Sequence, residues 1–290
     1  MFKLPYLFFD IGGTNTRLAV SQSGTSFSRT KIYPTPREYN EGISILSKFF
    51  LEELKSLSPG VIVGGIAGPL NKEKTLSTNP PNLPGWQNKP LQETLSTRFN
   101  CPVFLENDTA LAGLGEASVG AGKNHNLVAY LTISTGVNGV RLVHKKIEEN
   151  SLGFEIGHQI IDFDNSFHLG TSSGRGELED FISGREVAKR FNSDPAKITD
   201  QSAWDQIAEF LSVGIANTIL YWSPEIIVLG GSMMKKISLD VVSDHLSKRL
   251  SIFSKLPPMK KAELGDLGVL YGALHYLTQL DLDEVNAQKV

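Results

Sequence analysis

The sequence predicts an α/β protein of two domains. Strand-like runs rich in β-branched residues alternate with segments of helical periodicity. The 290 residues are also enough for roughly two domains. A pattern of strand, glycine turn and strand occurs twice, because "GTNTRLAV" aligns with "GVNGVRLV" and places Gly13 over Gly136. This echo predicts two copies of one β-β-β-α unit facing each other.

The first half supplies the first copy of this unit. Strands are expected at 7–10, 17–21 and 26–33, joined by the turns "GGTN" and "QSGT". "GVIVGGIAGPL" and "CPVFLEND" read as buried strands, "LSTNPPNLPGW" is irregular because its prolines remove donors, and "TALAGLGEAS" is helical. One side of the first helix is expected to carry Ile43, Leu46, Phe50, Leu54 and Leu57.

The second half repeats the order. "NLVAYLTISTGVNGVRLVHKKI" gives a strand, a glycine turn and a strand, and "EIIVLGGSMM" is a strand that runs into two glycines. A last helix is expected at 266–280. The long helix before Ser223-Pro224 carries a core stripe of Trp204, Ile207, Leu211, Ile215, Ile219 and Trp222.

Composition narrows the class of protein. The net charge of −3 leaves no basic excess that would predict nucleic acid or an anionic membrane as a partner. No apolar stretch approaches the about 20 residues that span a bilayer. The lone Cys101 cannot form an internal disulfide, and the N-terminus lacks a signal-peptide pattern. A cytoplasmic protein is therefore expected.

Two glycine turns are candidate phosphate sites. Gly12 and Gly13 allow close backbone approach to anionic oxygens, Thr14 and Asn15 add donors, and Asp10 is placed to hold a hydrated Mg²⁺. The turn is not a Walker loop, and a plain β-hairpin is the alternative.

The second turn, "TISTGVNGV", offers Ser134, Thr135 and Gly136 between two strands in the same way. Two such turns predict a clamp on the β- and γ-phosphates of a nucleotide.

Acidic and imidazole groups follow the turns. Asn107-Asp108 precedes a helix, so Asp108 is either an N-cap or a base that accepts a proton from an attacking hydroxyl. Glu155, His158 and Glu179 would suit a polyol pocket, because carboxylates accept hydrogen bonds from sugar hydroxyls. The alternatives are a core histidine and a surface glutamate.

Taken together, these segments resemble the sugar kinases of the ROK family, within the actin/hexokinase-like ATPase superfamily. The resemblance covers nearly the whole chain and rests on motifs in family order: "DIGGTNTR", "GGIAGPLN", "STNPPNLPGW", "ENDTALAGLGEA", "STGVNGV", "FEIGH", "IVLGGS" and "GVLYGALHYL". It implies two actin-like (ribonuclease H-like) domains, each a mixed β-sheet flanked by helices, with an active-site cleft between them. The domains are expected at 1–119 plus 275–290, and at 120–274.

The resemblance also implies roles for residues. Asp108 would be the general base, and the two turns would bind ATP with Mg²⁺ near Asp10, with Gly230 and Gly231 near the adenosine. The sugar ligands would be Asn82, Asn107, Glu155, His158 and Glu179.

The implied activity is phosphorylation of the 6-hydroxyl of an aldohexose, with glucose first. The alternatives are an N-acetylglucosamine or N-acetylmannosamine kinase, a fructokinase, or a non-catalytic sugar-binding protein. The repressor branch of the family is disfavoured, because the first phosphate turn begins at Asp10 and leaves no room for a DNA-binding domain. A homodimer is the expectation by resemblance alone.

Two departures from the family pattern stand out. Many members hold structural zinc with three cysteines, and here Gly170, Ser172 and Glu177 occupy those places. We therefore expect no structural zinc, with His158 free to serve the sugar and His168 an ordinary loop residue. Asn15 replaces a common lysine, and strand alternation is expected to turn Arg17 away from substituting for it.

Overall fold

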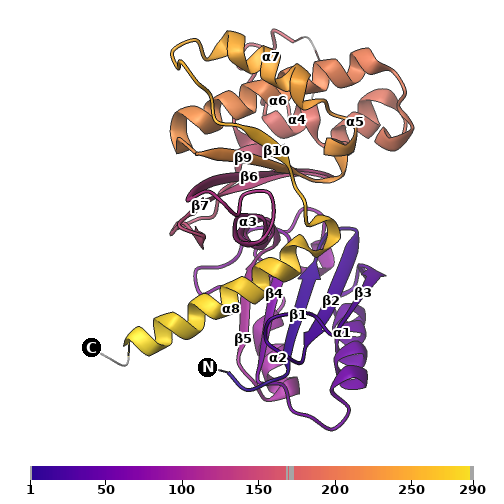
Figure 1. Ribbon diagram of the computed structural model, residues 1–290. Helices are drawn as coiled ribbons and strands as arrows, with labels where there is room; N and C mark the ends of the chain where they lie inside the picture. Colours follow the sequence, from indigo (N-terminus) through magenta and orange to yellow (C-terminus); the bar gives the residue numbers. More distant parts are fainter. Residues whose placement is uncertain (1, 168, 170–172, 288–290) are drawn as a thin grey trace. The chain divides into compact units, whose positions relative to one another are not determined.

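The computed structural model describes residues 2–167, 169 and 173–287. The chain divides into two units (Figure 1). Unit 1 comprises Met1–Ser118, Glu149–Gly153 and Asp266–Val290, and unit 2 comprises Val119–Glu148 and Phe154–Gly265. The chain thus returns to unit 1 at Asp266, ahead of the predicted position 275. Each unit contains a mixed five-stranded sheet with flanking helices, which confirms the predicted fold class.

The sheet of unit 1 has the order β3-β2-β1-β4-β5. Its strands are β1 (Tyr6–Ile11), β2 (Asn15–Ser21), β3 (Arg29–Pro34), β4 (Val61–Ile66) and β5 (Val103–Asn107). Strands β1, β4 and β5 run parallel, and the register pairs Ile11 with Ile66 and Ile66 with Asn107. The carboxyl ends of all three strands therefore meet at one edge, where ligands bind in open α/β sheets.

Helices cover both faces of this sheet (Figure 1). They are α1 (Tyr39–Leu54), α2 (Leu91–Phe99), α3 (Asp108–Ser118), α8 (Gly268–Ala287) and the short η1 (Pro84–Trp86) and η5 (Gly265–Leu267). Leu7, Phe9 and Ile11 of β1 join the core formed with α1 and α2. Alternation then directs Asp10 to the opposite face, which packs against α3 and α8.

Helix α1 is shorter than predicted. It ends at Leu54 because Lys55 adopts a left-handed conformation with φ of 55°. Leu57, expected on the buried side of the helix, is 58% exposed. The prediction for Leu57 was therefore wrong, since its apolar spacing continues past the true end of the helix.

The sheet of unit 2 has the order β10-β9-β6-β7-β8. Its strands are β6 (Leu127–Ile133), β7 (Val137–Val143), β8 (Lys146–Ile147), β9 (Ile226–Gly230) and β10 (Met259–Lys261). Its helices are η2 (Ile156–His158), α4 (Leu178–Ile182), α5 (Gly184–Phe191), η3 (Pro195–Lys197), α6 (Gln201–Trp222), η4 (Ser232–Lys235) and α7 (Leu239–Arg249).

The core of unit 2 lies between this sheet and its helices (Figure 1). The predicted stripe of α6 is part of it: Trp204, Ile207, Leu211, Ile215 and Ile219 are buried, and Trp222 packs against them. Among the described residues, no helix has the length and apolar character needed to cross a membrane.

Candidate active site

The first glycine turn joins β1 to β2 as a tight hairpin. The Gly12 N–H donates to the Asn15 carbonyl at 3.1 Å, and the Thr35 N–H donates to the Thr14 carbonyl at 2.9 Å. Within the described part of the chain, the Gly13 and Thr14 amides have no hydrogen-bond partner in the protein. These two exposed donors are available to an anion, whereas the Gly12 amide, which the sequence also offered, is bonded within the turn.

Asn82 lies directly against this turn. A Cβ atom on Gly13 would come within 2.6 Å of the Asn82 Cβ, so only glycine permits the approach. The loop that carries Asn82 is anchored by Trp86, which is 1% exposed and donates its indole N–H to the Pro36 carbonyl at 3.0 Å. The structure thus brings a predicted sugar ligand and a predicted phosphate turn together within unit 1.

Asn107, not Asp108, caps helix α3. The Asn107 Oδ1 accepts the Ala110 N–H at 3.1 Å, and its Nδ2 donates to the Gly68 carbonyl at 3.1 Å. The Asp108 Oδ1 accepts the neighbouring Thr109 N–H at 2.7 Å. Because another side chain serves as the cap, the simple structural role for Asp108 loses its support.

Arg17 joins two carboxylates beside this edge. It is the register partner of Asp10, and its Nη1 donates to the Asp10 Oδ2 at 3.0 Å. Its Nε donates at 3.1 Å to the Oδ1 of Asp266, which lies in η5 just before α8 begins. The expectation that alternation turns Arg17 away was therefore wrong, because directly paired residues on adjacent strands share one face.

Burial sets the electrostatics of both carboxyl groups. Burial, followed by the nearby Asp108 charge, raises the pKa of Asp10 to about 7, while Arg17 opposes the shift. Burial also raises the pKa of Asp108. A carboxylate with a raised pKa accepts a proton more readily near neutral pH than an exposed one does.

The second glycine turn, in unit 2, follows the same design. The Ser134 N–H donates to the Gly136 carbonyl at 2.9 Å between β6 and β7. As far as the described residues go, the amides of Thr135 and Gly136 have no partner, which parallels Gly13 and Thr14. Each unit therefore presents two adjacent free amides at a strand-turn-strand corner.

Gly230 and Gly231 lie beside the second turn. Gly230 is paired with Thr132 near the carboxyl ends of parallel strands β9 and β6. Gly231 has φ of 94°, and a Cβ atom there would lie 2.1 Å from the Ile133 carbonyl oxygen. Both the conformation and the contact demand glycine at this position.

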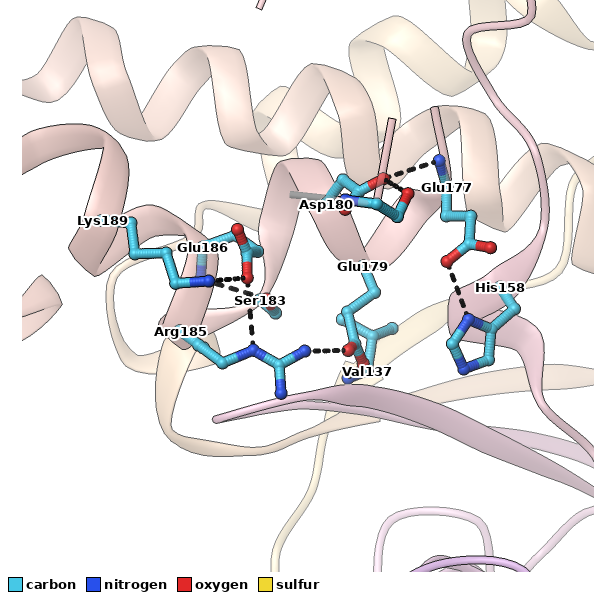
Figure 2. A network of polar contacts seen from close by, with 10 residues as sticks. Val137, His158, Glu177, Glu179, Asp180, Ser183, Arg185, Glu186 and Lys189 are labelled. Atoms are coloured by element: carbon cyan, nitrogen blue, oxygen red, sulfur yellow. Dashed lines mark hydrogen bonds and ion pairs between the residues drawn. The ribbon is translucent and has the colours of Figure 1, made fainter. Parts of the chain in front are cut away.

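Three predicted sugar ligands also gather around the start of β7. Helix η2 packs so closely that a Cβ on Gly157 would lie 2.2 Å from the Val137 carbonyl oxygen, which places Glu155 and His158 nearby. Glu179 accepts the Val137 N–H through its carboxylate (Figure 2). The structure therefore groups Glu155, His158 and Glu179 around one residue.

His158 is not free, in contrast to the expectation. Its Nδ1 lies 2.8 Å from the Glu177 Oε2, and the Arg175 Nη1 donates to the Glu177 Oε1 at 3.1 Å. Gly170, Ser172 and His168 lie outside the described residues. Glu177, which stands where the family pattern has a cysteine, thus binds the His158 Nδ1. The other ring nitrogen, Nε2, is left for a ligand.

The pKa of His158 is expected to lie above its ordinary value of 6.5, first because of the hydrogen bond to Glu177 and against partial desolvation. The Glu177→Gln variant should lower this pKa, since the amide cannot neutralise the imidazolium. NMR titration of the ring protons in both proteins measures the shift, and His144 serves as the internal reference. Equal His158 pKa values in the two proteins would contradict the pairing.

Sequence reasoning missed three of these groups: Arg17 as the partner of Asp10, Asp266 as the second partner of Arg17, and Glu177 as the partner of His158. The tight "GGTN" turn already fixes the register that pairs positions 10 and 17, so Arg17 had a usable signal. The other two depend on contacts between segments separated in sequence, Arg17 with Asp266 and His158 with Glu177.

Each of the two α/β units has a mixed sheet with a hairpin that is closed by a glycine turn. This architecture is the actin-like ATPase fold. The model of the ROK family matches residues 6–279, and the chain belongs to the ROK family.

The proteins similar to this chain include two kinds of kinase. The chain is 31% identical to a glucokinase of Pyrobaculum calidifontis, over 92% of this chain and 93% of that protein. It is 27% identical to an N-acetyl-D-glucosamine kinase of Escherichia fergusonii, over 92% and 97% of the two chains. A ROK family glucokinase from Streptomyces griseus, solved in complex with glucose and AMPPNP, shares the fold with a TM-score of 0.78. Its identity is 21%, over 94% of this chain and 99% of that one.

Proposed function

We propose that this protein is an ATP-dependent sugar kinase that transfers the γ-phosphate of MgATP to the 6-hydroxyl of an aldohexose, with glucose as the first candidate. The observation that carries the proposal is that Asn107 caps α3 and leaves the Asp108 carboxylate for chemistry. In this role Asp108 accepts the proton of the sugar hydroxyl as its oxygen attacks the γ-phosphorus. Burial, which raises the pKa of Asp108, favours that transfer.

The phosphates of ATP would be bound by the free amides of the two turns, with Gly230 and Gly231 near the adenosine. Phosphoryl transfer depends mainly on positioning and on neutralising charge, and Mg²⁺ bound with the nucleotide would supply that neutralisation. Because Arg17 occupies the Asp10 Oδ2, Asp10 suits a hydrated Mg²⁺ better than direct coordination.

For the sugar, we propose Asn82, Asn107, Glu155, His158 and Glu179 as ligands. Asn82 lies against the first turn in unit 1, and Glu155, His158 and Glu179 lie around Val137 in unit 2. His158 would act through Nε2, since Nδ1 is engaged by Glu177.

An N-acetylhexosamine kinase is the second candidate, and similarity to the Escherichia fergusonii enzyme favours it. Glucose ranks first because the identity to the Pyrobaculum calidifontis glucokinase is higher, at 31% against 27%. One or two pocket residues decide whether a 2-acetamido group is accepted.

A coupled ADP-release assay tests the proposal. The panel contains glucose, mannose, fructose, N-acetylglucosamine and N-acetylmannosamine with MgATP, and a reaction without sugar measures background hydrolysis. We expect turnover well above background with glucose. Preference for an N-acetylated sugar would select the second candidate. Background rates with every sugar, in protein that still binds one of them by calorimetry, would contradict the kinase and favour a sugar-binding protein.

A further inference from the structure

The second glycine turn is held by a polar network from α4 and α5 (Figure 2). The Glu179 Oε2 accepts the Val137 N–H at 2.7 Å, and its Oε1 accepts the Arg185 Nη2 at 2.7 Å. The Arg185 Nε donates to the Glu186 Oε1 at 3.2 Å. Arg185 thus lies between two carboxylates, one of which fixes the first residue after the turn.

The same segment also holds the turn through its backbone. The Gly184 N–H donates to the Ser134 carbonyl at 2.7 Å, and the Arg185 N–H donates to the Thr135 carbonyl at 3.3 Å. These bonds direct two carbonyl groups of the turn toward α5. The side chain and the backbone of Arg185 therefore act on one element, the turn that offers its free amides to phosphate.

Gly136 shows how close the Glu179 carboxylate lies. A Cβ atom at position 136 would be 2.9 Å from the Glu179 Oε2, so the carboxylate fills space that a side chain would need. Such a negative charge beside a phosphate turn repels the ligand unless a cation neutralises it. Arg185 is the cation that contacts Glu179 in the described network.

We propose that Arg185 is a positioning residue for the second phosphate turn. It neutralises Glu179 and holds its carboxylate where Oε2 fixes the Val137 amide, and thereby fixes the turn. The inference rests on the proposed function for the nature of the ligand, and it adds a role for Glu179 beyond sugar binding. Arg185 acts through Glu179 and not by contact with the substrate.

Lys189 offers a matched control. Its Nζ donates to the Glu186 Oε1 at 2.9 Å, so it belongs to the same network, and none of the bonds drawn between the described residues of Figure 2 joins it to Glu179. Lys189→Met removes a cation of equal charge one turn further along α5. If the positive charge in general is what matters, both variants should lose AMPPNP affinity. If the contact with Glu179 is what matters, only Arg185→Met should lose it.

The experiment compares wild type with Arg185→Met, Arg185→Lys and Lys189→Met. AMPPNP affinity is measured by calorimetry, the KM values for ATP and sugar by kinetics, and exchange of the Val137 amide by NMR or mass spectrometry. For Arg185→Met we expect AMPPNP affinity and KM for ATP to worsen by about tenfold to a hundredfold, the range of a charged hydrogen bond. The Val137 amide should exchange faster, and the sugar KM should change less.

The remaining variants sharpen the result. Arg185→Lys should recover part of the affinity, and Lys189→Met should behave as wild type. Glu179→Gln placed in the Arg185→Met background should also recover part of the AMPPNP affinity, because it removes the unpaired charge.

Wild-type AMPPNP affinity and Val137 exchange in Arg185→Met would overturn the inference, and so would equal losses in Lys189→Met. Failure of the proposed function looks different, since the wild-type protein would then neither turn over nor bind AMPPNP. In that case exchange at Val137 alone decides whether Arg185 holds the turn.

Discussion

Asp108→Asn is expected to lower kcat by about two to four orders of magnitude, the usual contribution of a positioned general base. An amide keeps the shape and accepts the Thr109 N–H but cannot take the proton of the sugar hydroxyl. Stability should not fall, because burial disfavours the charged form of Asp108, as its raised pKa shows. Steady-state kinetics, sugar binding by calorimetry and urea unfolding measure the three quantities.

Asp205→Asn in α6 is the control for Asp108→Asn. Its carboxylate accepts only an exposed hydrogen bond from Gln201 among the bonds described, at 2.9 Å. This variant should keep wild-type kcat. A near-wild-type kcat in Asp108→Asn would remove Asp108 as the base, and a loss of sugar binding equal to the loss of kcat would show a binding role instead.

Arg17→Met is expected to lower the free energy of unfolding by up to about 3 to 5 kcal/mol at pH values above the raised folded-state pKa of Asp10, where it strands a buried carboxylate. The Asp10 side chain is only 4% exposed and Arg17 is its ion-pair partner. The pKa of Asp10, already about 7 with Arg17 present, should rise further without it. Ionisation of Asp10 then penalises the folded state alone.

The sign of the pH dependence follows from this shift. An acid with a raised folded-state pKa binds more protons when folded, so its effect on stability worsens as pH rises from its unfolded value of 3.8 toward and through the folded value. The deficit of Arg17→Met should therefore be larger at pH 8 than at pH 5, as urea unfolding at both values would measure. Adding Asp10→Asn should restore most of the stability and remove the extra slope, whereas a deficit independent of pH and unchanged in the double variant would contradict the account.

The sheets and the glycine turns were predictable because their signals are local. Two apolar runs flanking "GGTN" or "STG" define a strand-turn-strand unit without any knowledge of distant contacts. The end of α1 was missed because Leu57 keeps the apolar spacing, while the left-handed Lys55 that ends the helix has no clear residue signature. Apolar periodicity predicts which side of a helix is buried, but it does not predict where the helix ends.

The contacts of the candidate site residues could not be predicted from the sequence. The sequence pattern allowed Asp108 to be either the N-cap of α3 or a base, and the Asn107–Ala110 bond shows that Asn107 is the cap. The partners of His158 and Glu179 come from segments folded back onto β7, where the pairing depends on side-chain geometry. The prediction for Arg17 failed for a different reason. The register between β1 and β2, and not the alternation along one strand, decides which side chains meet.

The most direct test of the central claim is the position of the transferred phosphate. The panel sugar with the highest turnover is labelled with ¹³C at C6 and incubated with MgATP and the protein, and the product is observed by ¹³C and ³¹P NMR. The account predicts splitting of the C6 resonance by ³¹P, at a rate that Asp108→Asn nearly abolishes. Inorganic phosphate without a sugar phosphate, or a phosphate ester at another carbon, would contradict it.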